Sequence, residues 1–152
     1  MKKAVKVVFI LFLCTQLSFA QNNEEDILKD PEFIELKKES ISYFTSDEYL
    51  KRQKTFDEFI AKMPEDFSFE DNFESWVKER INDTQFNSVE EAIAAKEYLD
   101  HLSEESDKKV LPIHRKRNLL NKKYGLRVFE KIYSEEVDHV IIMTLLDKSQ
   151  EE

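Results

Sequence analysis

Residues 88–102, SVEEAIAAKEYLDHL, indicate the fold class most clearly. Ser88 followed three positions later by Glu91 is the capping-box pattern found where helices begin. Apolar residues then return at spacings of three and four, which places them on one helix face: Ala92, Ile93, Ala95, Leu99 and Leu102. The stretch therefore predicts an amphipathic helix.

The composition of the whole chain favours the same structure. One glycine and three prolines are too few for the frequent turns that a sandwich or barrel requires. Glu, Lys and Leu are the most frequent residues, and all three are good helix formers. Nine phenylalanines, Trp76 and five tyrosines follow residue 20, and this aromatic content argues against disorder. We expect the aromatic residues around Trp76 to belong to the core.

Upstream of residue 88 the sequence predicts three further helices. Asp30 as N-cap and Pro31 at the first helical position begin one that reaches Phe44. Ser46 caps a second, which Pro64 ends. Ser68 is predicted to cap a third, whose apolar face carries Phe69, Phe73, Trp76, Val77 and Ile81.

Downstream, the polar stretch 103–109 is predicted as a connector. A fifth helix is expected from Val110, with Pro112 near its start and Gly125 just after its end. A last helix is predicted over 129–145. A strand over 140–146 is the alternative, but no convincing partner strand precedes it. The prediction is an all-α fold, a compact bundle or orthogonal array of about five to six amphipathic helices.

The amino terminus has the features of a secretory leader. Lys2, Lys3 and Lys6 precede an apolar run over 7–13, and Ser18 and Ala20 are the small residues that signal peptidase requires. The run is shorter than the roughly 20 residues of a spanning helix. We expect cleavage after Ala20, export to the periplasm or extracellular space, and one helical domain over 21–152 with no membrane span. Cys14 leaves with the leader, so packing alone stabilises the mature chain.

The charge is distributed unevenly along the chain. Loss of three leader lysines takes the formal net charge from −9 to −12, which argues against general binding to nucleic acid or anionic membrane. Residues 108–131 nevertheless hold nine basic side chains and one acidic side chain. The default expectation is that they pack against acidic helices of the same domain. The alternative is an open patch for a protein or an anionic envelope component, with these candidate residues: Arg115, Lys116, Arg117, Lys122 and Lys123.

Motifs for catalysis or metal binding are incomplete. Residues 135–139, EEVDH, resemble the zinc-protease helix pattern, but Glu135 stands where a histidine ligand is required. Glu136 and His139 form half of the ligand set of a di-iron bundle, and the second Glu-x-x-His is missing. Glu97 and His101, one helical turn apart, are the remaining candidates for an improvised site. One glycine cannot build a nucleophile elbow.

These observations favour a non-catalytic interaction module over an enzyme. We therefore predict no metal, no cofactor and no catalytic residue. The alternative is a metal- or carboxylate-dependent enzyme that uses Glu97, His101, Glu136 and His139. The sequence leaves the oligomeric state open.

Overall fold

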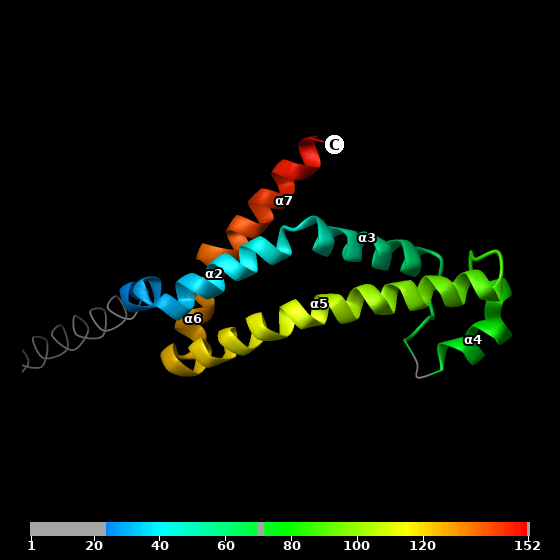
Figure 1. The fold of residues 1–152 in the computed structure, drawn as a ribbon, viewed down its shortest axis with the longest axis horizontal. Helices are drawn as coiled ribbons and strands as arrows, with labels where there is room; N and C mark the ends of the chain where they lie inside the picture. The colour runs from blue at the N-terminus through cyan, green and yellow to red at the C-terminus, as the bar shows by residue number, and fades with distance from the viewer. Residues whose placement is uncertain (1–23, 70–71, 152) are drawn as a thin grey trace, which may run out of the picture. The chain divides into compact units, whose positions relative to one another are not determined.

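The computed structural model describes residues 24–69 and 72–151, and every regular element within them is helical. This confirms the predicted all-α class. Residues 24–29 are α-helical, and the helices that follow are α2 (Pro31–Phe44), α3 (Asp47–Ala61), α4 (Phe73–Arg80), α5 (Val89–Tyr124), α6 (Leu126–Tyr133) and α7 (His139–Glu151) (Figure 1). A 3₁₀ turn, Ile81–Asp83, follows α4, and a π-helical turn, Ser134–Asp138, joins α6 to α7. The predicted leader, residues 1–20, lies outside the described residues.

The chain divides into two compact units. Within the described residues, unit 1 comprises 24–45 and 112–151, and unit 2 comprises 46–69 and 72–111. Helix α5 is a single helix of 36 residues that contributes to both units. The predicted single domain over 21–152 stays a prediction.

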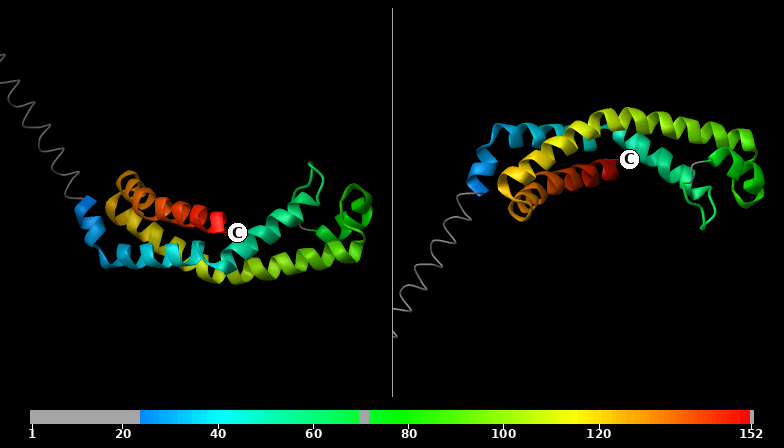
Figure 2. Two further views of the ribbon diagram at one scale, coloured as in Figure 1. Left: turned by 90° about the horizontal axis from the view of Figure 1, so that it is seen from above. Right: turned by 90° about the horizontal axis from the view of Figure 1, so that it is seen from below.

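Unit 1 is built around α2, the carboxyl-terminal part of α5, α6 and α7, which lie side by side (Figure 2). Phe33 of α2 meets Phe129 of α6 edge to face, with ring centroids 5.9 Å apart. The hydroxyl of Tyr133 donates to the Oγ of Ser40 at 3.0 Å, and both residues are buried. This polar pair is satisfied internally, so it ties α6 to α2 inside an otherwise apolar core.

Unit 2 has an aromatic core. Phe59 of α3 is buried together with Val77, Phe86 and Leu99, and further apolar side chains pack around them. Trp76 lies 5.0 Å from Phe67 between ring centroids and packs against this core. Trp76 is thus part of the packing, as expected from its spacing with Phe73.

Three predicted helix starts are confirmed by their capping bonds. The Asp30 carboxylate accepts from the Glu32 amide at 2.8 Å, and the Ser46 hydroxyl accepts from the Tyr49 amide at 3.2 Å. The Ser88 hydroxyl accepts from the Glu91 amide at 3.1 Å. Each bond satisfies an amide that the helix itself leaves unpaired, which is why these residue types predict helix starts well.

The predicted start of the third helix at Ser68 is wrong. Helix α4 begins at Phe73, and its N-cap is Asn72, whose side chain accepts from the Ser75 amide at 3.1 Å. Phe67 and Phe69 pack their rings 5.1 Å apart between centroids, outside any helix. Aromatic packing thus holds this stretch as a loop, although its spacing continues the helical pattern.

The predicted connector over 103–109 is also wrong, because α5 continues through it. The stretch consists of residues compatible with a helix, and Lys108 pairs with Glu105 three positions earlier. Its polarity marks a solvated helix face rather than a break. Pro112 therefore lies inside α5 instead of near the start of a separate helix.

Two further predictions concern the carboxyl-terminal region. Gly125 ends α5 as expected: its φ is +86°, and its amide donates to the Asn121 carbonyl at 2.9 Å. The predicted helix over 129–145 is interrupted by the π-helical turn, which a 3.6-residue period does not reveal. Residues 140–146 lie within α7, so the strand alternative is wrong. No helix of the described chain combines the length and the apolarity needed to cross a membrane.

Candidate functional site

The predicted basic residues lie on the carboxyl-terminal part of α5, in unit 1, where acidic residues of α2 are within reach. Lys116 places its ammonium 2.7 Å from a carboxylate oxygen of Glu39 and 3.1 Å from one of Glu35. These two acids raise the pKa of Lys116, with the hydrogen bond to Glu39 as the largest contribution. Lys116 is therefore neutralised within its own unit.

Arg117 is likewise engaged inside unit 1. Its guanidinium donates through two nitrogens to the Glu130 carboxylate of α6, and the Nε bond is 3.1 Å long. It also lies 4.0 Å from the ring centroid of Tyr133. Asn121 donates to the same carboxylate, and the bond from Arg117 is the main cause that lowers the pKa of Glu130. Because Arg117 pairs with Glu130 and stacks on Tyr133, it fixes the packing of α5 on α6.

Lys123 joins the amino-terminal end of α2. Its ammonium lies 2.8 Å from Asp30, which also accepts from the Tyr124 hydroxyl at 2.7 Å. Burial raises the pKa of Asp30, but bonds from Lys123, Tyr124 and the Glu32 amide outweigh it and lower the pKa overall. The Asp30 carboxylate is thus charged and almost fully buried, and its bonds connect α2 to α5.

Arg115 and Lys122 behave differently from the other three. Both are exposed, and neither forms an ion pair with any residue that the structure describes. Asn118 and Leu119 lie between them on the same side of α5, and Leu119 is 60% exposed. We call Arg115, Asn118, Leu119 and Lys122 the α5 face. Its two cations are seven positions apart in the chain, which is about 10.5 Å along the helix axis.

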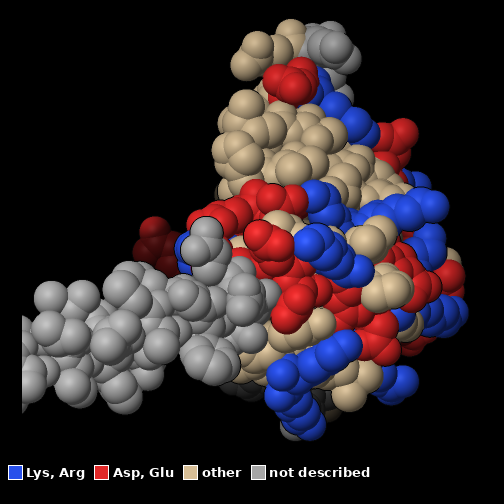
Figure 3. All heavy atoms as spheres, turned by 90° about the vertical axis from the view of Figure 1, so that its left-hand side faces the viewer, with Lys and Arg blue, Asp and Glu red and all other residues tan. Residues whose placement is uncertain are grey.

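The structure therefore divides the predicted patch. Lys116, Arg117 and Lys123 adopt the internal arrangement, whereas Arg115 and Lys122 point to solvent. Figure 3 shows the end of unit 1, where basic side chains alternate with acidic ones instead of forming one block. What remains for a partner is a pair of cations on either side of an exposed leucine, so its role as a site stays a prediction.

The candidates for a metal site are distributed over both units. Glu97 and His101 lie on α5 in unit 2, and Glu136 and His139 lie in unit 1. Glu136 accepts from the Lys37 ammonium at 2.5 Å, a contact that joins α2 to the π-helical turn. Within residues 24–69 and 72–151, no three His, Cys, Asp or Glu side chains are grouped so that they could hold a metal ion.

Exposed apolar residues lie on the same helices as these polar ones, and the sequence pattern does not reveal their exposure. Leu119 on α5 and Ile142, Met143 and Leu146 on α7 are each between 46% and 60% exposed. A helical period predicts which residues share a face, but an apolar residue is assigned to the core by default. Only the packing shows which apolar side chains face solvent.

Comparisons with known proteins identify no relative. No protein-family model, curated protein sequence or solved structure matches this chain. Any function must therefore be argued from the α5 face and its surroundings.

Proposed function

We propose that this protein is an exported, non-catalytic binding module that holds an acidic segment of a partner protein on the α5 face. The observation that carries the proposal is the division of the basic segment. Of the five predicted patch residues, Lys116, Arg117 and Lys123 hold unit 1 together, whereas Arg115 and Lys122 form no ion pair within the described residues. Export rests on the predicted leader, and an intact mass beginning at Gln21 tests it.

The chemistry of the face indicates the kind of partner. Arg115 can bind a carboxylate through two parallel N–H donors, and Lys122 offers a second cation two turns away. Leu119 between them offers an apolar contact. A partner segment with carboxylates about 10 Å apart and an apolar residue between them matches this arrangement.

The strength of such binding depends on salt. Both cations are exposed, so each ion pair contributes only about 0–1 kcal/mol. Attraction must also overcome the net negative charge of the protein as a whole. We expect binding that is measurable at low ionic strength and that weakens once the Debye length falls to about 10 Å.

The test is retention on immobilised polyglutamate at low salt, followed by a salt gradient. The protein is used from Gln21 onward, the form that the predicted cleavage leaves. The double variant Arg115→Gln/Lys122→Gln should elute at lower salt than the unchanged protein, because both cations of the α5 face are lost.

A matched control removes two exposed lysines elsewhere. Lys38→Gln/Lys54→Gln causes the same change in net charge on α2 and α3, and it should elute like the unchanged protein. Equal elution of all three proteins contradicts the proposal. Parallel retention on a sulfated polysaccharide shows whether the face selects carboxylates or any polyanion.

A further inference from the structure

Unit 2 contains a cavity of about 80 Å³ beside its aromatic core, which we call the aromatic pocket. Its lining consists of four aromatic rings, one hydroxyl side chain and one ammonium side chain: Phe67, Ser68, Phe69, Phe73, Trp76 and Lys96. Phe69 is 53% exposed, so the pocket is open to solvent beside this ring. Aromatic walls with few polar groups are the usual composition of small-molecule sites.

The aromatic walls hold one another in place. Phe67 meets Phe69 and Trp76 edge to face, at 5.1 and 5.0 Å between ring centroids. Phe73 stacks on Trp76 at 6.1 Å. Phe67, Phe73 and Trp76 also pack against the buried core of unit 2. These three walls are therefore anchored before a ligand arrives, and binding requires little further ordering of side chains.

Lys96 of α5 brings a cation to this apolar surface. Its side chain is only 20% exposed, and its ammonium lies 5.8 Å from the ring centroid of Phe69 and 5.9 Å from that of Phe73. The same ammonium donates to the two carboxylate oxygens of Asp100 at 2.8 and 2.7 Å. An ammonium has three N–H donors, so one donor remains for an acceptor in the pocket.

The charges around the pocket restrict the ligands that it accepts. A cationic ligand is repelled, because the Lys96 ammonium already lies where a cation would contact the rings. An anionic ligand has to compete with Asp100 for Lys96, and residues 46–111 hold 18 acidic and nine basic side chains. An uncharged aromatic ring with one hydrogen-bond acceptor avoids both penalties.

We propose that the aromatic pocket binds a small uncharged aromatic molecule that carries one oxygen acceptor. The ligand ring lies against Phe67, Phe73 and Trp76, and its oxygen accepts from the Lys96 ammonium. The cavity volume is about half of the roughly 150 Å³ of a cavity that binds benzene, so a single ring fills the pocket and extends through its open side. Benzyl alcohol represents this class of ligand. The site lies in unit 2 and does not depend on the α5 face.

Titration of the chain from Gln21 onward with benzyl alcohol, followed by the fluorescence of Trp76, tests the site. Trp76 is the single tryptophan and lines the pocket. We expect a saturable change with a dissociation constant on the order of 1 mM, because so small a molecule makes few contacts. Phe69→Ala removes the exposed wall and should weaken binding about three- to tenfold. Tyr98→Ala is the matched control, since Tyr98 is 43% exposed in unit 2 and does not line the pocket.

A pair of probes tests the contribution of Lys96. Toluene has the same ring as benzyl alcohol but no oxygen. Lys96→Met keeps a long unbranched side chain and removes the donor, so it should weaken the binding of benzyl alcohol about three- to tenfold relative to toluene. Benzoate and benzylamine, which carry opposite charges, should each bind more weakly than benzyl alcohol.

Four results overturn the proposal. The first is the absence of a saturable Trp76 signal up to about 20 mM benzyl alcohol, well above the expected dissociation constant. The second is equal affinity of Phe69→Ala and the unchanged protein. The third is a preference for benzyl alcohol over toluene that Lys96→Met leaves unchanged. The fourth is tighter binding of benzoate or benzylamine, since it shows that the ligand is charged.

Discussion

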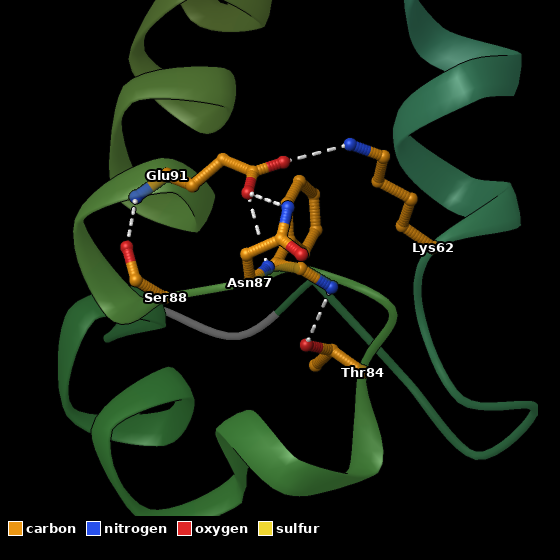
Figure 4. A network of polar contacts seen from close by, with 6 residues as sticks. Lys62, Thr84, Asn87, Ser88 and Glu91 are labelled. Atoms are coloured by element: carbon orange, nitrogen blue, oxygen red, sulfur yellow. Dashed lines mark hydrogen bonds and ion pairs between the residues drawn. The ribbon is translucent and has the colours of Figure 1, made fainter.

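At the scale of single residues, Glu91 shows how one side chain holds several elements in place. Its carboxylate accepts from the Lys62 ammonium at 2.9 Å and from the amide and side chain of Asn87 at 3.0 and 2.7 Å (Figure 4). The capping box predicted at Ser88 is thus realised with a difference. The Ser88 hydroxyl caps the Glu91 amide, whereas the carboxylate returns to Asn87. Lys62, the residue that follows α3, pairs with Glu91 and so connects the end of α3 to the start of α5 within unit 2.

Glu91 provides the first prediction, which concerns pH. The bond from Lys62 is the largest of the causes that hold the pKa of Glu91 at about 2, below its ordinary 4.5. Because the folded pKa is lowered, Glu91 stabilises the fold above about pH 4.5, and this contribution is lost as pH falls toward 2. Lys62→Met should move the pKa upward toward 4.5, as measured by NMR titration of the Glu91 carboxyl.

A second lysine serves as the control for this titration. Lys78 pairs with Glu74 on the surface of α4, so Lys78→Met removes a comparable ion pair. Lys78→Met should leave the pKa of Glu91 unchanged. An unchanged Glu91 pKa in Lys62→Met shows that Lys62 does not cause the shift.

At the scale of elements, the boundary between α5 and α6 depends on Gly125. This residue has φ +86°, a backbone conformation that residues with a Cβ rarely adopt. Apart from the two neighbouring residues in the chain, nothing lies within 4 Å of the position that a Cβ would occupy. The requirement for glycine is therefore conformational, since nothing excludes a methyl group by contact.

We predict that Gly125→Ala lowers the free energy of unfolding by about 1–3 kcal/mol, the cost of a strained backbone conformation. Urea denaturation followed by circular dichroism measures the change. Ala94→Gly, at an exposed position within α5, is a reference for ordinary helix propensity and should cost about 1 kcal/mol or less. If Gly125→Ala is as stable as the unchanged protein, the helix end tolerates other conformations.

At the scale of the whole molecule, the question is whether the two compact units unfold together. Each has its own buried residues, Phe33 and Phe129 in unit 1 and Phe59 and Val77 in unit 2. The single helix α5 belongs to both, and a helix propagates cooperatively along its length. We therefore expect one unfolding transition, in agreement with the predicted single domain.

Trp76 makes this prediction measurable, because it is the single tryptophan and lies in unit 2. Its fluorescence reports on unit 2, whereas circular dichroism at 222 nm reports on all helices. The two denaturation curves should superimpose. Phe33→Ala in unit 1 should lower the free energy of unfolding by about 3–5 kcal/mol. Both curves should therefore shift together to lower denaturant concentration. If the transition measured by Trp76 fluorescence does not shift in Phe33→Ala, the two units unfold separately.

The sequence by itself determined the fold class and the helix starts whose signal is local. Asp30, Ser46 and Ser88 cap their helices through bonds to amides within three residues, so their role is visible without any tertiary contact. Gly125 is visible for the same reason, since its conformation is a local property. The basic residues of 108–131 were also found as a group, because charge can be counted along the chain.

Only the tertiary structure decided how those groups are used. The loop at Phe67 and Phe69 depends on rings that pack together instead of continuing a helix. The division between Lys116, which binds Glu39, and Arg115, which faces solvent, depends on where α2 lies against α5. The exposure of Ile142, Met143 and Leu146 depends on which side of α7 its own unit covers. Such contacts join residues far apart in the chain, and a periodic pattern specifies a face without specifying what covers it.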